Sequence, residues 1–183
     1  APDLMNWLMN TELGDPQPVH RLDLGVSGVL LCALDTEERT RLGQLLENQE
    51  MEKSYWALVY GVTRPKGVIR RPLKDARRKR SLSAITRYRR LEAFPPHCSL
   101  LDIRLETGRK HQIRRHLEGI NHPLIGDKRY RGRRKRPLKG APERIWLHAH
   151  RIELPGGQVF EAPLPEDLED HLKQLREHGT PVE

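Results

Sequence analysis

The segments of this chain that have strand-like patterning follow one another with connections too short to contain a crossover helix. Parallel neighbouring strands need a connection of a dozen or more residues, usually a helix, whereas antiparallel neighbours need only a tight turn. The order of segments therefore predicts an α+β fold, with a mixed, mainly antiparallel β-sheet flanked by helices. The predicted strands lie at residues 28–34, 54–61, 84–91 and 99–106 and on both sides of the Pro-Gly-Gly turn at 155–157, and the predicted helices at 35–49, 113–120 and 165–175.

The residue patterns support these elements one by one. In the helix predicted at 35–49, Asp35 is a typical N-cap residue, and Leu42 and Leu46 lie four residues apart on one face. In the strand at 99–106, apolar and charged residues alternate, as in a strand with one buried face. With 183 residues, the chain is long enough to bury a core and is expected to form a single domain over 1–183.

Positive charge dominates the chain and is unevenly distributed. Lys and Arg together number 33 and Asp and Glu 25, which gives a formal net charge of +8. Residues 63–90 contain twelve Lys and Arg and one acid, Asp75, and seven of the nine residues at 128–136 are basic. We expect mobile basic loops at 64–80 and 128–139 that meet phosphate groups. A polyanion, RNA or DNA, is therefore a better partner than a membrane, and no apolar run approaches the ~20 residues of a spanning helix.

A group of charged residues, His20, Arg21 and Asp23, directly precedes an apolar segment. Charged groups are costly to remove from water unless they are paired or used. The small residues that follow indicate an irregular entry into a strand, where a carboxylate can face a cleft. A second dense stretch at 107–127 holds several Arg, Lys and His residues, and an Arg from it could pair with Asp23. The alternative is an ordinary structural ion pair between Asp23 and Arg21 or another residue.

Other catalytic arrangements find little support in the sequence. His111, His116 and His122 are spaced by five and six residues without the H-E-x-x-H pattern, so no metal site is predicted. Ser27 has no Gly-x-Ser-x-Gly context, and no phosphate-binding loop ends in Lys-Ser or Lys-Thr. The cysteines, Cys32 and Cys98, are expected to be buried free thiols.

Several separate motifs, in order along the chain, resemble those of the RluA-type family of RNA pseudouridine synthases. The first resembles the signature H-R-L-D-x-x-[TS]-S-G, with Val26 where Thr or a similar residue is usual. The other motifs resemble, in order, a K-x-Y strand, an A-x-T-x-Y strand, a T-G-R-x-H-Q-[IL]-R block, an H-P-[IL]-x-G-D segment and a closing L-H-A and F-x-A-P-L-P pair. The matching segments are HRLDLGVSGVLL, EKSYWALVYG, SAITRYRRLE, LETGRKHQIRRHL, NHPLIGDKRYRG and WLHAHRIELP with FEAPLPEDL, which together span about residues 18–170.

The resemblance implies a role for four residues and the catalytic fold of the pseudouridine synthases. Asp23 would be the catalytic carboxylate, and Arg21 would help to displace the target nucleotide from its stack. Tyr55 would lie against the uracil ring, and Arg114 would pair with Asp23 and keep it ionised. The family normally has a preceding strand with a K-P-x-G motif and often an S4-type RNA-binding domain. We therefore expect a single catalytic domain that lacks this N-terminal strand segment and has no S4-type domain.

The reaction implied by the resemblance is the isomerisation of uridine to pseudouridine within RNA. Such a reaction needs no cofactor and no metal. The implied partner is a structured RNA, tRNA or rRNA, and the implied protein is a cytoplasmic monomer that does not bind membranes. Two other functions stay open: a non-catalytic RNA-binding protein on the same scaffold, and a metal-dependent RNA hydrolase that uses the histidines. The sequence identifies neither the RNA nor the uridine.

Overall fold

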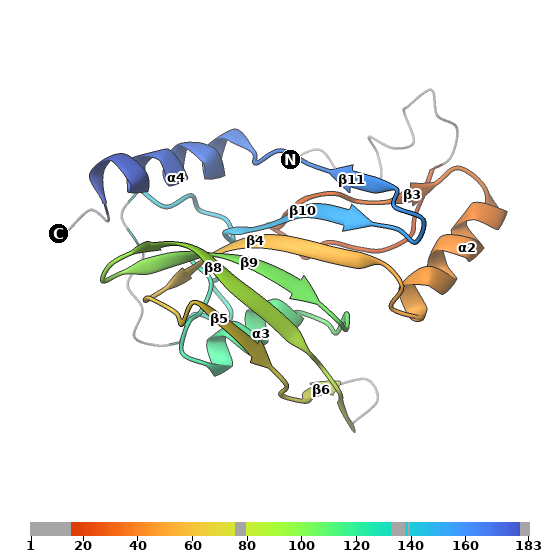
Figure 1. Ribbon diagram of the computed structural model, residues 1–183, viewed down its shortest axis with the longest axis horizontal. Coiled ribbons are helices and arrows are strands. Elements are labelled where there is room, and N and C mark those ends of the chain that lie inside the picture. Colours follow the sequence, from red (N-terminus) through yellow and green to blue (C-terminus); the bar gives the residue numbers. More distant parts are fainter. Residues whose placement is uncertain (1–15, 76–79, 133–137, 139, 180–183) are drawn as a thin grey trace.

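A seven-stranded sheet forms the centre of the computed structural model, which describes residues 16–75, 80–132, 138 and 140–179 (Figure 1). Its strand order is β11-β10-β4-β9-β8-β5, with β2 beside β10. The pairs along that path are antiparallel, and β2 pairs with β10 in parallel. The predicted mixed, mainly antiparallel sheet is confirmed. The strands of this sheet are β2 (Ser27–Gly28), β4 (Glu52–Tyr60), β5 (Lys66–Ile69), β8 (Thr86–Phe94), β9 (Cys98–Leu105), β10 (Leu147–Glu153) and β11 (Val159–Glu161).

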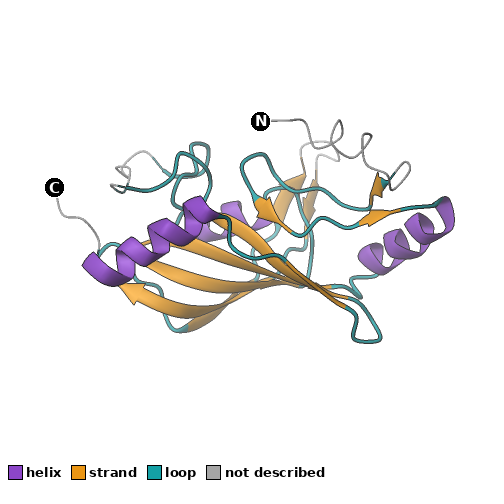
Figure 2. Cartoon of the chain, turned by 90° about the horizontal axis from the view of Figure 1, so that it is seen from above, coloured by secondary structure: helices purple, strands orange, loops and turns teal. Residues whose placement is uncertain are grey.

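Two helices cover opposite faces of the sheet. Successive residues of a strand point to opposite faces, so Ala57 and Val59 of β4 pack in one cluster with Leu117, whereas Leu58 packs in another with Leu168. Leu117 belongs to α3 (Gln112–Gly119) and Leu168 to α4 (Glu166–His178). Figure 2 shows α4 lying along the sheet. The helices predicted at 113–120 and 165–175 are thereby confirmed, each with its apolar stripe against the sheet.

The third helix, α2 (Thr36–Glu47), forms as its sequence predicts. The backbone N–H of Glu38 donates to the Asp35 carboxylate at 2.7 Å, which caps the helix. Leu42 is buried in a smaller cluster with Leu31 and Met51. This cluster fixes the chain that enters the sheet, where β1 (Gln17–Pro18) pairs with β3 (Cys32–Ala33) outside the main sheet.

The prediction of one continuous strand at 28–34 is wrong. It is divided into β2, which pairs with β10, and β3, which pairs with β1. Gly28 explains the break, because its φ is +120° and its Cα is pressed against the backbone of Ala149 in β10. After one further hydrogen bond, from the Val29 N–H to the Ala149 carbonyl at 2.8 Å, the chain leaves the main sheet.

The basic segment at 64–80 is not a mobile loop throughout, which corrects the prediction. It contains β5, paired with β8, and β6 (Leu73–Asp75), paired with β7 (Arg80–Leu82). The apolar residues between the basic ones account for this, because Ile69 and Leu73 are buried. Residues 76–79 lie outside the described part. In the second basic segment, residues 128–132 form neither helix nor strand, and residues 133–137 and 139 are again outside the described part.

Three further predictions concern the burial of the two thiols, the absence of a membrane-spanning helix and the extent of the domain. Both cysteines are free; Cys98 is buried as predicted, whereas Cys32 is only partly buried. None of the helices in the described residues is both long and apolar enough to cross a bilayer. The single domain predicted over 1–183 includes residues 1–15 and 180–183, which lie outside the described part, so its extent stays a prediction.

Gly28→Ala tests the close contact between β2 and β10. The added Cβ would lie within 2.6 Å of the backbone nitrogen and carbonyl carbon of Ala149, at a φ that side chains disfavour. We expect the free energy of unfolding to fall by about 2–4 kcal/mol in urea denaturation. Gly43→Ala is the control, because nothing lies within 4 Å of its Cβ in α2; it should raise stability by roughly 0.5–1 kcal/mol. Equal midpoints for Gly28→Ala and the parent would contradict this account.

Candidate active site

Asp23 lies in the loop between β1 and β2, and local hydrogen bonds fix the shape of that loop. The backbone N–H of Leu31 donates to Nε2 of His20 at 3.1 Å. The backbone N–H of Val26 donates to the Asp23 carbonyl at 3.0 Å, and Gly25 completes this turn with a φ of +81°. The Asp23 carboxylate is thereby held at the side of the sheet that carries α3.

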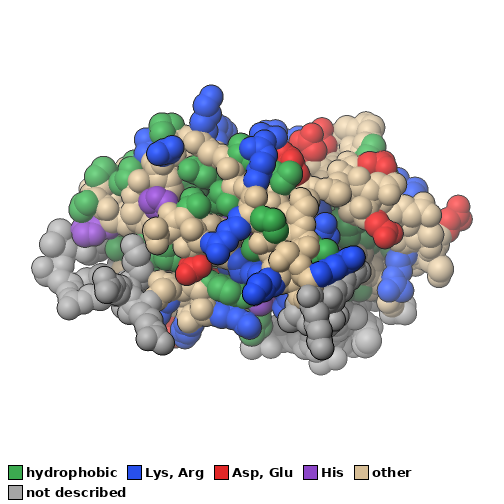
Figure 3. Space-filling model, turned by 90° about the horizontal axis from the view of Figure 1, so that it is seen from below, with side chains coloured by type: hydrophobic (Ala, Val, Ile, Leu, Met, Phe, Trp, Pro, Cys, Tyr) green, Lys and Arg blue, Asp and Glu red, His purple; other side chains and the backbone are tan. Residues whose placement is uncertain are grey.

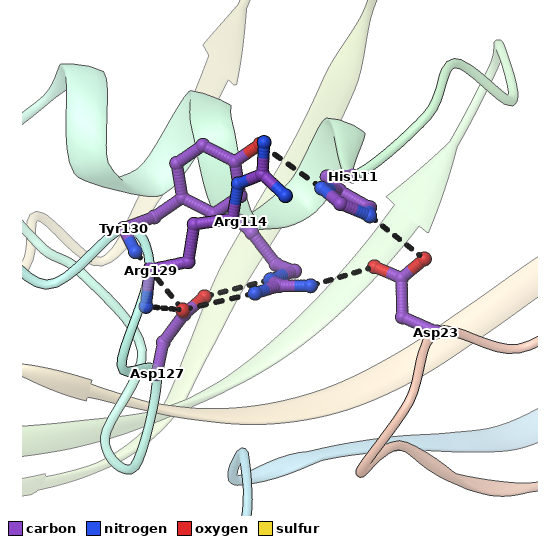
Figure 4. A network of polar contacts seen from close by, with 6 residues as sticks. All are labelled: Asp23, His111, Arg114, Asp127, Arg129 and Tyr130. Atoms are coloured by element: carbon purple, nitrogen blue, oxygen red, sulfur yellow. Dashed lines mark hydrogen bonds and ion pairs between the residues drawn. The ribbon is translucent and has the colours of Figure 1, made fainter.

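Arg114 of α3 reaches this carboxylate. Its Nη1 donates to Oδ2 of Asp23 at 3.3 Å, and its side chain is 8% exposed (Figure 4). The two residues are 91 positions apart in the sequence. The structure therefore brings together the two residues for which the sequence predicted an ion pair.

A second carboxylate, Asp127, holds the other edge of the Arg114 guanidinium. Nε and Nη2 of Arg114 donate to the two carboxylate oxygens of Asp127 at 2.7 and 3.0 Å, and the backbone N–H groups of Arg129 and Tyr130 donate to its Oδ1. Burial alone would raise the pKa of Asp127, but these hydrogen bonds hold that pKa below its ordinary value. Asp127 is therefore ionised at neutral pH, and its pairing with Arg114 satisfies a charge that is almost fully buried.

His111 and Tyr130 complete the network around Arg114. The Arg114 guanidinium lies 4.9 Å from the centre of the Tyr130 ring, whose hydroxyl is 2.9 Å from Nδ1 of His111. Nε2 of His111 is 3.6 Å from Oδ1 of Asp23. Burial lowers the pKa of His111, and the nearby positive charge of Arg114 lowers it further, although Asp23 acts in the opposite direction. Arg114 is therefore the permanent cation at Asp23, and His111 is a neutral neighbour at pH 7.

Buried polar side chains fix α3 against the sheet. Nε2 of Gln112 donates to the Ile85 carbonyl and to Oγ1 of Thr86. His116 bridges the Thr86 hydroxyl, 2.9 Å from its Nδ1, and the Arg71 carbonyl, 2.8 Å from its Nε2. Because burial lowers the pKa of His116, the ring is neutral and fits one donor and one acceptor. These bonds set the position of the helix from which Arg114 projects.

Tyr55 of β4 faces the same side of the sheet, packed against the apolar cluster under α3. Burial, with a smaller contribution from the negative charge of Asp23, raises the pKa of Tyr55 to about 12. The phenol is therefore un-ionised at neutral pH and offers a ring face and a neutral hydroxyl. Arg21 is different: its side chain is exposed and makes no ion pair with any residue in the described ranges.

The sequence missed the second carboxylate of the site. Asp127 and Tyr130 lie in the segment NHPLIGDKRYRG, whose motif predicts no role for either residue, and His111 was considered only as a metal ligand. The available signal was Asp127 itself, an acid separated only by one glycine from the apolar residues Leu124 and Ile125. A carboxylate in that setting needs a cationic partner. Among the described residues, no group of three or more His, Cys, Asp or Glu side chains is arranged to hold a metal ion.

Comparisons of this chain with a family model and with curated proteins agree on one family. The family model described as RNA pseudouridylate synthase matches residues 6–119. Ribosomal large subunit pseudouridine synthase D of Vibrio cholerae is 36% identical over 182 residues, and an uncharacterized RNA pseudouridine synthase of Mycobacterium bovis is 38% identical over 175. These alignments cover 87% and 88% of this chain and 56% of each relative. The chain thus spans little more than half the length of these curated relatives.

Two solved structures have the same fold. Human RNA pseudouridylate synthase domain containing 4 superposes with a TM-score of 0.79 at 24% identity, covering 94% of this chain and 80% of that one. Human RNA pseudouridylate synthase domain containing 1 gives a TM-score of 0.75 at 21% identity, with 98% and 87% covered. The motif order, the Asp23–Arg114 pair and these matches agree, and the chain belongs to the RNA pseudouridylate synthase family.

Proposed function

We propose that this chain isomerises uridine to pseudouridine in RNA and that Asp23 is the carboxylate that attacks the target nucleotide. The observation that carries this proposal is the placement of Asp23 against Nη1 of Arg114, whose Nε and Nη2 donate to the buried Asp127. An Arg fixed in this way orients the carboxylate for attack on the nucleotide. Membership of the RNA pseudouridylate synthase family supports the same assignment.

The proposed reaction balances without an oxidant, a reductant or a cofactor. Asp23 attacks the sugar or the base, and the bond between ribose C1′ and uracil N1 breaks. The uracil turns, C5 bonds to C1′, and the bond that Asp23 formed breaks, which returns the free carboxylate. C5 gives up its proton, and N1 gains one. Tyr55 would lie against the ring during the turn, since its neutral phenol is suited to stacking.

A uridine in a folded RNA has to leave its stack before it can reach Asp23, which costs a few kcal/mol. Arg21 is the residue proposed to displace it, being exposed and only two positions from Asp23. Phosphate contacts would offset the rest of the cost. Lys and Arg side chains spread over the middle of the face in Figure 3, whereas acidic side chains in that view lie mostly toward the end of the molecule that carries α2.

The proposed substrate is a structured RNA, either tRNA or rRNA. The names of the relatives from Vibrio cholerae and Salmonella typhimurium, ribosomal large subunit pseudouridine synthase D, favour rRNA. A protein that acts on ribosomal RNA would work in the cytoplasm, and we propose that it acts there as a monomer without a metal or a cofactor.

The direct test is tritium release from RNA labelled at uracil C5, with Asp23→Asn as the variant. C5 loses its hydrogen only when it becomes the new glycosidic carbon. The parent should release tritium, and the variant should bind the RNA equally well while its rate falls by about 10⁴-fold or more, as for other residues that form a covalent intermediate. RNA binding without release from the parent would indicate instead a non-catalytic RNA-binding protein.

Tyr55→Phe and Tyr55→Ala separate stacking from the hydroxyl. Phe keeps the ring face, so its kcat/KM for C5 tritium release should stay within a few-fold of the parent. Ala removes a stacking interaction worth ~1–3 kcal/mol, which corresponds to a loss of roughly 5- to 150-fold. Equal losses in both variants would assign the role to the hydroxyl and contradict the stacking proposal.

A further inference from the structure

Lys53 occupies an unusual place on the active-site face of the sheet. It is two residues from Tyr55 on β4, so both side chains point to the same face. Its register partner on β10 is Ile152, which is buried in the cluster beside α2. Lys53 itself is partly buried. The strand therefore places an ammonium group between two apolar clusters, on the side where Asp23 and Arg114 lie.

Two of the loops that form the site lie close to this ammonium. A Cβ built on Gly108, in the loop before α3, would be 3.9 Å from Nζ of Lys53. His20, in the loop that carries Asp23, is also close to Lys53. Burial lowers the pKa of His20, and the positive charge of Lys53 lowers that pKa further. Lys53 thus lies close to the Asp23 loop and the Gly108 loop, on the same face of β4 as Tyr55.

Among the described residues, no acidic partner accounts for this partly buried charge. Within residues 16–75, 80–132, 138 and 140–179, Lys53 makes neither an ion pair nor a side-chain hydrogen bond. Burial lowers its pKa, which shows that the site disfavours an uncompensated ammonium. A Lys is almost never fully buried unless it is paired, and a partly buried Lys without a partner leaves its ammonium available to an external anion.

The neighbouring cations are already engaged or fully exposed. Arg114 is shared between the two carboxylates, Asp23 and Asp127. Nε of Arg109 donates to the Ser83 carbonyl at 3.0 Å. Arg21 is exposed. Lys53 therefore differs from these cations in being both partly buried and without a partner among the described residues.

We propose that Lys53 binds a phosphate of the RNA backbone next to the target uridine and so fixes the depth at which the nucleotide enters the site. This inference rests on the proposed function, because it takes RNA as the ligand. The uracil and its sugar would be held by Tyr55 and Asp23. Lys53 lies two residues before Tyr55 in β4, beside the place of the nucleotide. A fully charged phosphate compensates a partly buried ammonium better than a neutral base carbonyl does.

The first part of the test measures RNA affinity as a function of salt, in the Asp23→Asn background so that no reaction occurs. The probe is a short stem-loop RNA with one uridine in its loop. Lys53→Gln should weaken binding about 10-fold and reduce the slope of log K against log[salt] by about 0.7–0.9, the value for one phosphate contact. Lys53→Arg should restore both. Lys173→Gln is the control, because Lys173 is 56% exposed on α4 and pairs with Glu169; its slope should equal that of the parent.

The second part replaces single phosphates of the same RNA by uncharged methylphosphonates, on the 5′ or the 3′ side of the uridine. One of the two replacements should weaken binding to the chain with Lys53 and leave binding to Lys53→Gln unchanged. Equal losses for both proteins at both positions would overturn the inference, even if Lys53→Gln binds weakly. Coupling without any tritium release from the parent would contradict the isomerase proposal alone, whereas normal release without coupling would contradict only the assignment of Lys53.

Discussion

The ion pair between Arg114 and Asp127 is the interaction on which the site depends. Both residues are buried, and removing two charges from water is favourable only when their hydrogen bonds are almost completely satisfied. Here the carboxylate accepts two N–H groups of the guanidinium and two of the backbone, and Tyr130 lies over the cation. Nη1 of the same guanidinium donates to Asp23. A structural pair thus sets the geometry of the proposed catalytic pair.

The sheet and α3 hold this geometry through separate parts of the chain. β4 carries Tyr55 and Lys53 on the face that α3 covers, and α4 packs on the opposite face, where the structure shows no part of the candidate site among the described residues. Gln112 fixes the start of α3 to the start of β8. The Asp23 loop joins this frame through the pairing of Gly28 with Ala149. Each proposed site residue is therefore positioned by contacts distant in sequence.

The sequence predicted the elements that depend on local patterns and missed those that depend on distant partners. The cap at Asp35 is local and is confirmed. The alternation in β9 is confirmed only from Leu101 onward, because residues 98–101 are buried on both faces of the sheet. The break after Gly28 follows from contact with Ala149, which no local pattern reveals. The contact between Arg114 and Asp23 was predicted from motif resemblance, but Asp127 was missed. The apolar residues before Asp127 indicate burial, whereas its partner, Arg114, is identified only by the fold.

The most direct test of the central claim is a double-mutant cycle on Arg114 and Asp127. The quantity measured for each variant is the single-turnover rate of C5 tritium release. Asp127→Asn keeps the size of the side chain but removes its charge, and Arg114→Lys keeps a cation but removes the paired geometry. If Asp127 acts by positioning Arg114, Asp127→Asn should slow the parent but add little to Arg114→Lys, a coupling of about 1 kcal/mol or more. Losses that add within about 0.5 kcal/mol would contradict the account.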